Sequence, residues 1–323
     1  MLQRTVERVL PLKPKRILIV TNVLQAEESE RQVSSYRGIP IDVIAEPAGR
    51  NTAPAIALAA AIIAAHDPSG VMVVLPADHY IRNEEALRES LLQAARTARK
   101  GYLVTLGIMP TRPETGYGYI EADTELRGEG PFPVLRFVEK PPLDKALEYL
   151  ESGNYFWNSG MFIWRADTIL SEIKKHVPQL SQAMSKININ CDIWELSDLE
   201  EIIEVAYSNV KSESIDYAVM ERSDKVQVVP VEMGWSDVGS WSALPEVVEQ
   251  DEQGTVCINA GLHVSIDSSD NLIYMDGKTV ATVGVKGLII VSTPDALLVC
   301  DRERAQDVRK VVEQLAATGG TCL

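Results

Sequence analysis

Short apolar runs alternate with helix-forming segments along the first third of the chain. Asn51 and Asn83 mark expected helix starts, because Asn caps helix N-termini, and a polar helix is expected at 25–36. Buried strands are expected between the helices, at Arg16–Val20, Ile41–Ala45, Val71–Leu75 and Tyr102–Gly107. Strands and helices that alternate at this rhythm predict an α/β protein with a right-handed, doubly wound, mostly parallel sheet.

The pattern changes twice further along the chain. Gly- and Pro-containing loops separate the expected strands Val134–Val138 and Phe156–Trp164, residues 166–222 are largely helical in pattern, and Trp235–Trp241 is predicted to open another helix. From about residue 251, short β runs are separated by Gly, Asp and Ser, which predicts a small β domain. We therefore expect two domains, at residues 1–250 and 251–323.

Two aspartates follow expected strands and are candidates for holding a metal. The apolar run Val71–Leu75 stops at Pro76, and Asp78 comes two residues later. In open α/β sheets ligands bind at the C-terminal edge of the strands, where this carboxylate would lie. Asp237 sits in a second, glycine-containing turn, and two carboxylates with phosphate oxygens and waters suit octahedral Mg²⁺. Taken singly, Asp78 also fits a turn cap and Asp237 a helix N-cap.

Three further patterns are compatible with a ligand site, and each has a plain structural alternative. The loop Gly116–Tyr119 permits close approach of backbone to a sugar or phosphate, or is an ordinary turn. Glu139 and Lys140 put a carboxylate and a phosphate-binding ammonium at a strand end, or form a solvated surface pair. Asn158–Gly160, in the middle of a strand, indicates a bulge or close ligand approach.

Composition narrows the class of protein. The chain has 323 residues, 46% hydrophobic and 24% charged, and its net charge of -15 argues against a nucleic-acid-binding surface. Its longest apolar stretch, Ala53–Ala65, is too short to cross a bilayer, and no apolar leader follows Met1. The four cysteines form no CxxC pair, which favours reduced thiols over zinc or disulfides. We expect a soluble, cytoplasmic protein without membrane association.

A set of motifs becomes specific when it is taken in chain order. The motifs are Glu46-Pro47 with Arg50–Pro54, Leu75–His79, Pro113–Ile120, Glu139–Pro141, Trp157–Phe162, Ser214–Glu221 and Trp235–Gly239. Over nearly the whole chain this set closely resembles the bacterial mannose-1-phosphate guanylyltransferase family. The resemblance implies a Rossmann-like nucleotidyltransferase fold followed by a small left-handed β-helix-like domain.

The resemblance also implies a reaction and a set of site residues. Mannose 1-phosphate would attack the α-phosphorus of GTP in line, giving GDP-mannose and pyrophosphate. Asp78 and Asp237 match the Mg²⁺-binding aspartates, and Lys140 matches a lysine that contacts the sugar phosphate. Arg112 is expected near the site from its place in the sequence alone. The sugar-side positions are Gly118, Glu139, Asn158 and Asp216, and the nucleotide-side positions are Glu46, Asn51, Thr52, Ala53, Pro76 and Ala77.

One part of the family pattern is missing from this sequence. The family begins with a strand and a glycine-rich GGxGxRLxP phosphate loop, whereas Leu2–Thr5 here matches the helix that follows that loop. Because the missing strand is central in such folds, we expect a gap between its neighbours, with unpaired backbone groups. We interpret the chain as a truncated or late-start form, so the resemblance does not assure activity in this form.

Two alternatives remain beside synthesis of GDP-mannose. The chain is also compatible with a nucleotidyltransferase for another sugar phosphate or base, and with a non-catalytic sugar-nucleotide-binding paralogue. The β domain is additionally a candidate for forming a homodimer.

Overall fold

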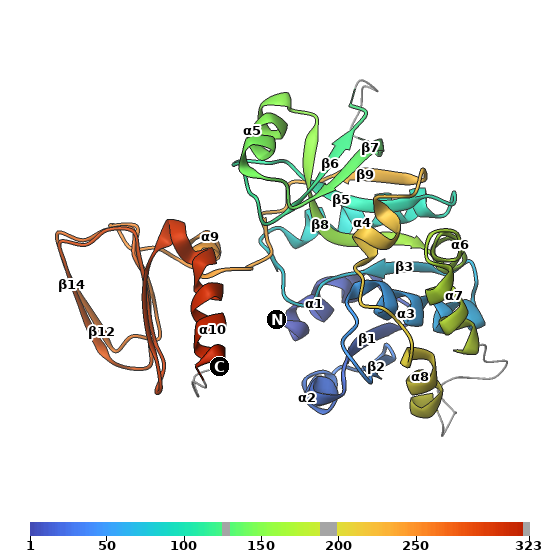
Figure 1. Cartoon of the computed structure of the whole chain (residues 1–323), viewed down its shortest axis with the longest axis horizontal. Helices are drawn as coiled ribbons and strands as arrows, with labels where there is room; N and C mark the ends of the chain where they lie inside the picture. Colours follow the sequence, from blue (N-terminus) through green and yellow to red (C-terminus); the bar gives the residue numbers. More distant parts are fainter. Residues whose placement is uncertain (125–129, 188–198, 319–323) are drawn as a thin grey trace. The chain divides into compact units, whose positions relative to one another are not determined.

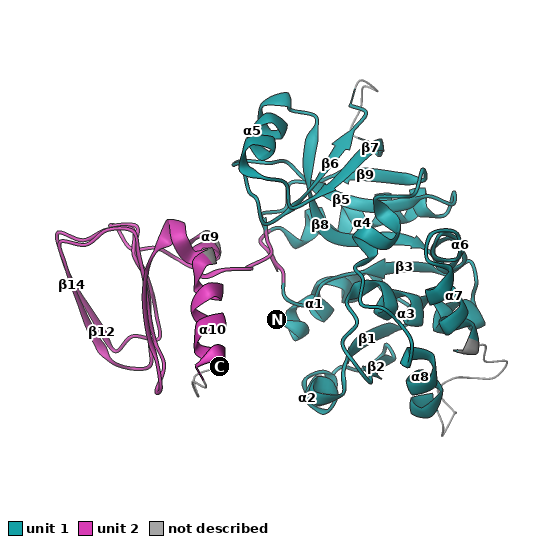
Figure 2. Cartoon of the chain, in the orientation of Figure 1, with its two compact units in different colours: residues 1–78, 83–235 teal, residues 79–82, 236–323 magenta. Residues whose placement is uncertain are grey.

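The computed structural model describes residues 1–124, 130–187 and 199–318 (Figure 1). The chain divides into two compact units (Figure 2). Unit 1 comprises Met1–Asp78 and Asn83–Trp235, and unit 2 comprises His79–Arg82 and Ser236–Leu323. The predicted boundary between residues 250 and 251 stays a prediction.

The alternation of strands and helices predicted for the first third of the chain is confirmed. Asn51 Oδ1 accepts the Thr52 N–H at 2.8 Å and Asn83 Oδ1 accepts the Ala86 N–H at 3.1 Å, so both helices begin where expected. The elements are α1 (Leu2–Val9), β1 (Ile17–Asn22), α2 (Val23–Val33), β2 (Ile41–Glu46), α3 (Thr52–His66), β3 (Val71–Val74), α4 (Glu84–Ala98) and β5 (Leu103–Ile108).

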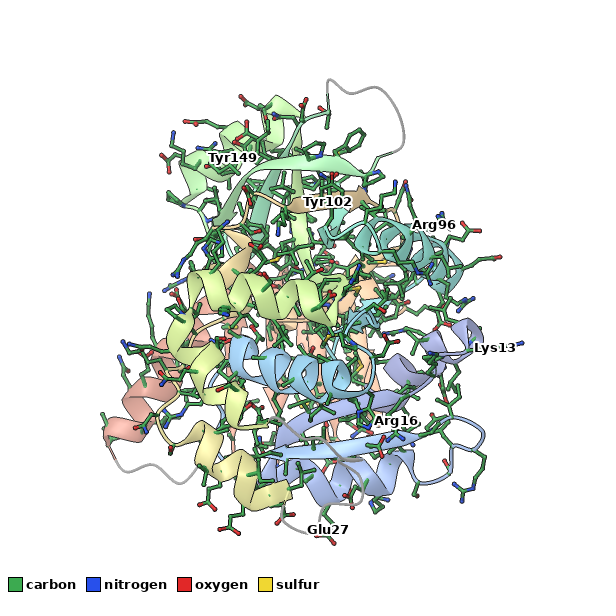
Figure 3. All side chains as sticks on the ribbon, turned by 90° about the vertical axis from the view of Figure 1, so that its right-hand side faces the viewer. Lys13, Arg16, Glu27, Arg96, Tyr102 and Tyr149 are labelled. Atoms are coloured by element: carbon green, nitrogen blue, oxygen red, sulfur yellow. The ribbon has the colours of Figure 1, made fainter. Side chains whose placement is uncertain are left out.

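The remainder of unit 1 adds strands, an outer helix and a largely helical stretch. Tyr149 of α5, labelled in Figure 3, stacks on Tyr155 of β8 with ring centroids 4.1 Å apart, which holds that helix on the sheet. The predicted helical stretch 166–222 is confirmed where it is described, and 188–198 lies outside the described residues. The elements are β6 (Gly118–Ala122), β7 (Phe132–Glu139), α5 (Leu143–Ser152), β8 (Tyr155–Arg165), α6 (Ala166–His176), α7 (Pro178–Met184), α8 (Leu199–Tyr207), a π-helix (Asp216–Met220) and β9 (Val226–Pro230).

The largest sheet is mixed, which corrects one part of the predicted fold. Its strand order is β3-β8-β5-β9-β7-β6. Among its described pairs β5–β9 is parallel, whereas β8 runs antiparallel to β3, β5 and β6, and β7 runs antiparallel to β6 and β9. The α/β class is therefore confirmed, but this sheet is not mostly parallel. Hydrophobic periodicity reports which residues are buried and does not report the direction of the neighbouring strand.

Strands β1 and β2 form a separate parallel sheet. Within the described residues, β1 pairs with β2 alone and β3 pairs with β8 alone, so each has one edge without a strand partner. Val73 of β3 is 39% exposed, in keeping with an uncovered position beside that edge. The expected gap in strand pairing is confirmed by this interruption between β1 and β3.

Helix α3 joins the two sheets through one hydrophobic core. Its residues Leu58 and Ile62 are buried in the same cluster as Ile44 of β2, Met72 of β3 and Trp164 of β8. The continuous core lets unit 1 stay compact although the sheet is interrupted, because apolar burial does not require strand pairing. No described helix, α3 included, is long and apolar enough to span a membrane.

Unit 2 is built from short strands, as the sequence predicts. The pairs β11–β13, β13–β15 and β12–β14 are parallel, which is typical of a β-helix, where each coil places its strands parallel to those of the coil before it. Its strands are β11 (Val256–Ile258), β12 (Leu262–Ile266), β13 (Leu272–Met275), β14 (Thr279–Val283), β15 (Leu288–Ser292) and β16 (Leu297–Asp301). These strands are followed by a 3₁₀ turn (Arg302–Asp307) and then by α10 (Val308–Ala317).

The prediction that a helix opens at Trp235–Trp241 is wrong for the first residues of that range. Trp235–Ser236 is instead a short strand, β10, which pairs with β4 (Tyr80–Ile81). Helical backbone begins only with the 3₁₀ turn Trp241–Ala243 and continues in α9 (Leu244–Val247). A strand partner so distant in sequence leaves no local signal, so context overrides the local preference.

Candidate functional site

The four residues predicted for the sugar side of the site lie together in unit 1. Gly118, at the start of β6, pairs with Glu139 at the end of β7. Asn158 of β8 donates its Nδ2–H to Oδ1 of Asp216 at 2.9 Å. A Cβ built on Gly118 would collide with the Glu139 carboxylate and lie 3.4 Å from Asn158 Cβ. We call Gly118, Glu139, Asn158 and Asp216 the sugar-side cluster, and a side chain at position 118 would require the Glu139 carboxylate to shift from its present place.

Asn158 is fixed at both ends of its amide. Its Oδ1 accepts hydrogen bonds from Thr105 Oγ1 and from the Gly160 N–H, each at 3.1 Å, while its Nδ2 faces Asp216. The register between β5 and β8 shifts here, and Gly160 has a φ of +68°, so the predicted bulge at Asn158–Gly160 is confirmed. Asn158 itself pairs with Gly107 at the edge of this bulge, and its side chain bonds to Asp216.

Lys140 brings a positive charge to the cluster through an unusual backbone conformation. Consecutive side chains of an extended strand point to opposite faces, so Glu139 and Lys140 would normally diverge. Lys140 instead has a φ of +49°, its N–H donates to Tyr117 O at 3.2 Å, and its Nζ lies 3.7 Å from Glu139 Oε1. Such a φ is costly for a non-glycine residue, and backbone conformations of this kind occur most often at functional sites. The left-handed conformation of Lys140 therefore makes it a candidate functional residue.

The cluster concentrates carboxyl groups in a partly buried space. Burial, followed by the nearby Asp216 carboxylate, raises the pKa of Glu139 to about 7, although Lys140 acts in the opposite direction. Burial also raises the pKa of Asp216, against hydrogen bonds from its own backbone N–H and from Asn158. Glu139 can therefore be protonated or ionised near neutral pH, as a donor or an acceptor for hydroxyl groups.

Glu221 belongs beside this cluster, and the sequence prediction missed it. The Glu221 N–H donates to Asp216 O at 2.9 Å, which is the i→i+5 bond of the π-helix. Burial and the Asp216 carboxylate raise the pKa of Glu221, and the Glu139 backbone N–H hydrogen-bonds its carboxylate. A spacing of five residues falls on one face of a π-helix but not of an α-helix, so the ordinary 3.6 periodicity gave no signal.

Aromatic rings form a wall next to Asn158. Tyr117 packs edge-on against Trp157 and Trp235, with centroids 5.3 and 5.1 Å away. Arg112 lies over the Trp157 ring at 5.3 Å and pairs with Glu114 at 3.3 Å. The expected cation Arg112 thus contacts the residue next to Asn158, and the wall supplies apolar surface beside a polar cluster.

Three predicted nucleotide-side residues lie at the start of α3, and two of them bond to another segment of unit 1. Asn51 has a φ of +68° and caps α3. Thr52 Oγ1 accepts the Ile215 N–H at 2.9 Å, and the Ala53 N–H donates to Glu213 O at 3.1 Å. The N-terminal end of α3 is therefore bonded to residues 213–215, and its contact with a base stays a prediction.

The other nucleotide-side residues occupy different settings. Glu46 ends β2, is 8% exposed and accepts the Tyr207 hydroxyl at 2.8 Å, while burial raises the pKa of its carboxyl. Ala77 follows β3 and is exposed, its carbonyl accepts the Thr5 hydroxyl at 3.2 Å, and Pro76 is half-buried beside it. Glu46 thus has a structural partner, and these residues' contact with a nucleotide is untested.

The two candidate metal ligands lie in different units. Asp78 is exposed at the end of the first segment of unit 1, and Asp237, in unit 2, accepts the Gly239 N–H on its Oδ1 at 3.1 Å. Among the described residues no group of three or more His, Cys, Asp or Glu side chains is arranged to hold a metal. Two carboxylate donors still suit Mg²⁺, which keeps several waters and uses few protein ligands.

Comparison with known proteins identifies the family of both parts of the chain. A model described as nucleotidyl transferase matches residues 1–254, and one described as MannoseP isomerase/GMP-like beta-helix domain matches residues 261–315. Mannose-1-phosphate guanylyltransferases of Escherichia coli strain K12 and Salmonella muenchen are 43% and 44% identical over 99% and 98% of this chain, and 67% and 66% of their own lengths. The chain thus spans about two thirds of these curated relatives.

A solved structure agrees with these relatives. The crystal structure of a mannose-1-phosphate geranyltransferase from Thermus thermophilus is 37% identical and superposes with a TM-score of 0.83, covering 98% of this chain and 89% of that one. That similarity extends over both units, which confirms the predicted combination of a nucleotidyltransferase fold and a β-helix-like domain.

The raised pKa of Glu139 gives a prediction about stability. Its carboxyl titrates near 7 when folded against a reference value of 4.5, so its stabilising contribution is full below 4.5 and is lost as pH rises through about 7. Glutamine does not ionise. As pH rises from about 5 to about 8, we therefore expect the unfolding free energy of the unsubstituted chain to fall by about 1 to 2 kcal/mol more than that of Glu139→Gln. Urea denaturation at both pH values measures this difference.

The exposed Glu148 of α5 provides a matched control for that measurement. Glu148→Gln should change stability by the same small amount at both pH values. Equal pH dependence in Glu139→Gln and the unsubstituted chain would show that Glu139 does not carry the proposed buried charge.

Proposed function

We propose, because this chain belongs to the nucleotidyl transferase family and within it to the mannose-1-phosphate guanylyltransferases, that it makes GDP-mannose and pyrophosphate from GTP and mannose 1-phosphate. The observation that carries the proposal is the sugar-side cluster. Its members come from β6, β7, β8 and the π-helix, and they are the residues that the family resemblance implies for the sugar pocket.

The chemistry of the cluster suits a sugar phosphate. Asn158 has one Nδ2–H engaged by Asp216 and its Oδ1 engaged by Thr105, so its remaining N–H has a defined direction for a sugar hydroxyl. Glu139, ionised above about pH 7, accepts hydrogen bonds from hydroxyl groups. The Lys140 ammonium neutralises the phosphate and orients the oxygen that attacks.

In the proposed reaction, a phosphate oxygen of mannose 1-phosphate attacks the α-phosphorus of GTP. The new P–O bond forms as the bond between the α-phosphorus and the bridging oxygen to the β-phosphate breaks, and pyrophosphate leaves. We assign the nucleotide to the side of Glu46, Asn51–Ala53 and Pro76-Ala77. Residues 1–323 contain no GGxGxRLxP loop, the motif whose backbone amides cradle the triphosphate in the family pattern.

We assign Mg²⁺ to Asp78 and Asp237. In the chain, Asp78 comes two residues before β4, and Asp237 comes directly after β10. Oxygen donors of this kind fit Mg²⁺, which when bound would neutralise charge on the phosphate oxygens.

Ligand discrimination tests the proposed substrates. With residues 1–323 we expect calorimetry in the presence of Mg²⁺ to detect GDP-mannose, and to find UDP-, ADP- and dTDP-sugars bound at least about 100-fold more weakly, because unmatched hydrogen-bonding groups on the base are penalised. Asn158→Asp should weaken GDP-mannose about tenfold or more, because it sets a second carboxylate against Asp216. Asn259→Asp, at an exposed amide–carboxylate pair in unit 2, should leave affinity unchanged.

The same measurement separates the alternatives. Preference for another base or sugar would assign the chain to a different nucleotidyltransferase, and absence of GDP-mannose binding would contradict the proposal. Pyrophosphate release from GTP and mannose 1-phosphate then tests turnover. Robust release by residues 1–323 alone would show that the glycine-rich loop is not required.

Substitution of the two aspartates tests the metal site. Asp78→Asn and Asp237→Asn each remove one anionic oxygen donor, so we expect each to raise the Mg²⁺ concentration for half-maximal GDP-mannose binding by about tenfold or more. Asp144→Asn, on the exposed first turn of α5, is the control and should leave that concentration unchanged. A Mg²⁺ dependence that survives both substitutions would place the metal elsewhere.

We also propose that the protein forms a homodimer in the cytoplasm. On β12, Leu262, Val264 and Ile266 are 56%, 42% and 53% exposed on one face, and Val283 of β14 lies beside Ile266 at 63% exposure. A second copy would cover this apolar face. The free thiols of Cys257 and Cys300 agree with a reducing compartment.

Light scattering tests the dimer. We expect twice the chain mass, and a shift to the single-chain mass for Val264→Glu, because a charge on the covered face opposes association. Leu92→Glu, at a 49% exposed position of unit 1, should leave the mass doubled. A single-chain mass for the unsubstituted protein at high concentration would exclude the dimer.

A further inference from the structure

Residues 213–221, which we call the connecting segment, contact both sides of the proposed site. At its start, the Glu213 N–H donates to Arg50 O at 3.2 Å and Glu213 O accepts the Ala53 N–H at 3.1 Å. The Ile215 N–H then donates to Thr52 Oγ1 at 2.9 Å. One residue later, Asp216 accepts the Asn158 amide at 2.9 Å. A shift of this segment would therefore move the loop before α3 and the sugar-side cluster together.

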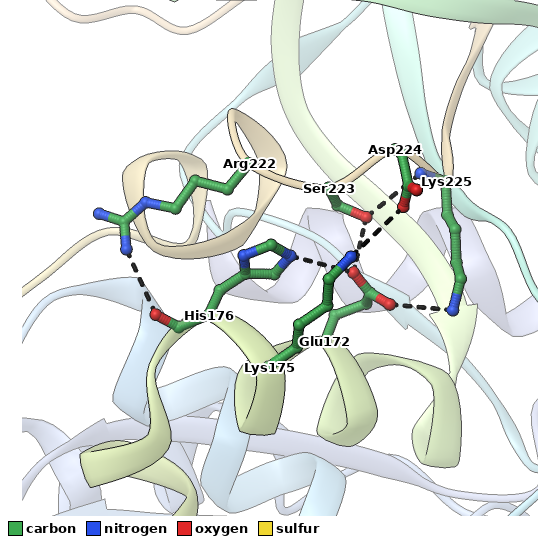
Figure 4. A network of polar contacts seen from close by, with 7 residues as sticks. All are labelled: Glu172, Lys175, His176, Arg222, Ser223, Asp224 and Lys225. Carbon is green, nitrogen blue, oxygen red and sulfur yellow. Dashed lines mark hydrogen bonds and ion pairs between the residues drawn. The ribbon is translucent and has the colours of Figure 1, made fainter.

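The residues directly after the connecting segment are hydrogen-bonded to α6 through the buried carboxylate of Glu172 (Figure 4). Glu172 is 2% exposed, and it accepts Ser223 Oγ at 2.8 Å and Lys225 Nζ at 2.9 Å. His176 Nε2, one turn along α6, lies 3.3 Å from the same carboxylate. Burial would raise the pKa of Glu172, but the hydrogen bonds from Lys225 and Ser223 outweigh it, and the pKa is lowered. Glu172 is thus an ionised, well-bonded anchor.

Arg222 ties the two ends of the connecting segment to the same helix. Its Nη2 donates to Glu213 Oε1 at 3.0 Å, at the start of the segment. Its Nη1 donates to the His176 carbonyl at 3.4 Å, at the C-terminal end of α6 (Figure 4). A guanidinium at a helix C-terminus is favourably placed against the helix dipole. The segment is consequently held by Arg222 at one end and by Glu172, through Ser223 and Lys225, at the other.

We propose that Glu172 is a positioning residue for substrate binding. By fixing Ser223 and Lys225 on α6, it sets the place of the connecting segment, which aligns the start of α3 at Asn51–Ala53 with the sugar-side cluster. Glu172 acts through this segment and not by touching substrate. The inference extends the proposed function and rests on it for the identity of the ligand. Arg222 has the same role from the other end of the segment.

Amide hydrogen exchange tests the positioning without any ligand. The Ala53 and Ile215 amides donate across the two contacts of the connecting segment, so looser positioning exposes them. In Glu172→Gln we expect the Ala53 and Ile215 amides to exchange at least about tenfold faster than in the unsubstituted chain. We expect the same increase in Arg222→Gln, where the substituted side chain is half-exposed. Asp167→Asn is the control. It removes from the same helix a carboxylate that pairs with Arg165, and it should leave the exchange rates of both amides unchanged.

Calorimetry with GDP-mannose, well below the melting temperature of each variant, gives the second readout. We expect about tenfold weaker binding for Glu172→Gln and for Arg222→Gln, with the double variant no weaker than the worse single one, because both act on one segment. Asp167→Asn should bind within about twofold of the unsubstituted chain. Effects that multiply in the double variant would overturn the shared mechanism.

The two readouts separate the inference from the proposed function. Unchanged Ala53 and Ile215 exchange in Glu172→Gln, or unchanged GDP-mannose affinity with only a lower melting temperature, would overturn the positioning role. Faster exchange in the variants, with no GDP-mannose binding even by the unsubstituted chain, would support the positioning and overturn the proposed ligand.

Discussion

The burial of Glu139 and Asp216 near each other is the constraint on which the site depends. Two carboxyl groups in a partly buried space repel each other when both are ionised, and burial raises the pKa of each. This repulsion is partly offset by the Asn158 amide, which donates to Asp216, and by the Lys140 ammonium, which lies beside Glu139. Gly118 contributes by lacking a side chain, since any Cβ there would displace the Glu139 carboxylate.

The rest of unit 1 serves to hold these groups in place. A β-bulge lies next to Asn158, a left-handed backbone conformation brings Lys140 near Glu139, and a π-helix sets Glu221 beside Asp216. All three are departures from regular structure, which proteins retain mainly where function requires them. The segment that carries Asp216 also bonds to the loop before α3, so a single backbone path links the two sides of the proposed site.

The interrupted sheet shows which forces hold unit 1 together. Strand pairing stops between β1 and β3 in the described chain, yet α3 buries its apolar side chains against residues from both sheets. Apolar burial is non-directional and spans the interruption, whereas backbone hydrogen bonds need a partner strand at a fixed spacing. The same interruption lies beside β3, the strand that leads to Asp78.

The sequence by itself determined the strand and helix segments, the Asn51 and Asn83 caps, the β texture of unit 2 and the motif set that marks the family. These depend on local chemistry and on residue order, which the chain carries directly. Tertiary structure alone decided the antiparallel direction of β8, the pairing of β10 with β4, and the places of Glu221 and Glu172. Each depends on a partner remote in sequence or on a rare helical period, and hydrophobic patterning identifies a buried face without identifying what covers it.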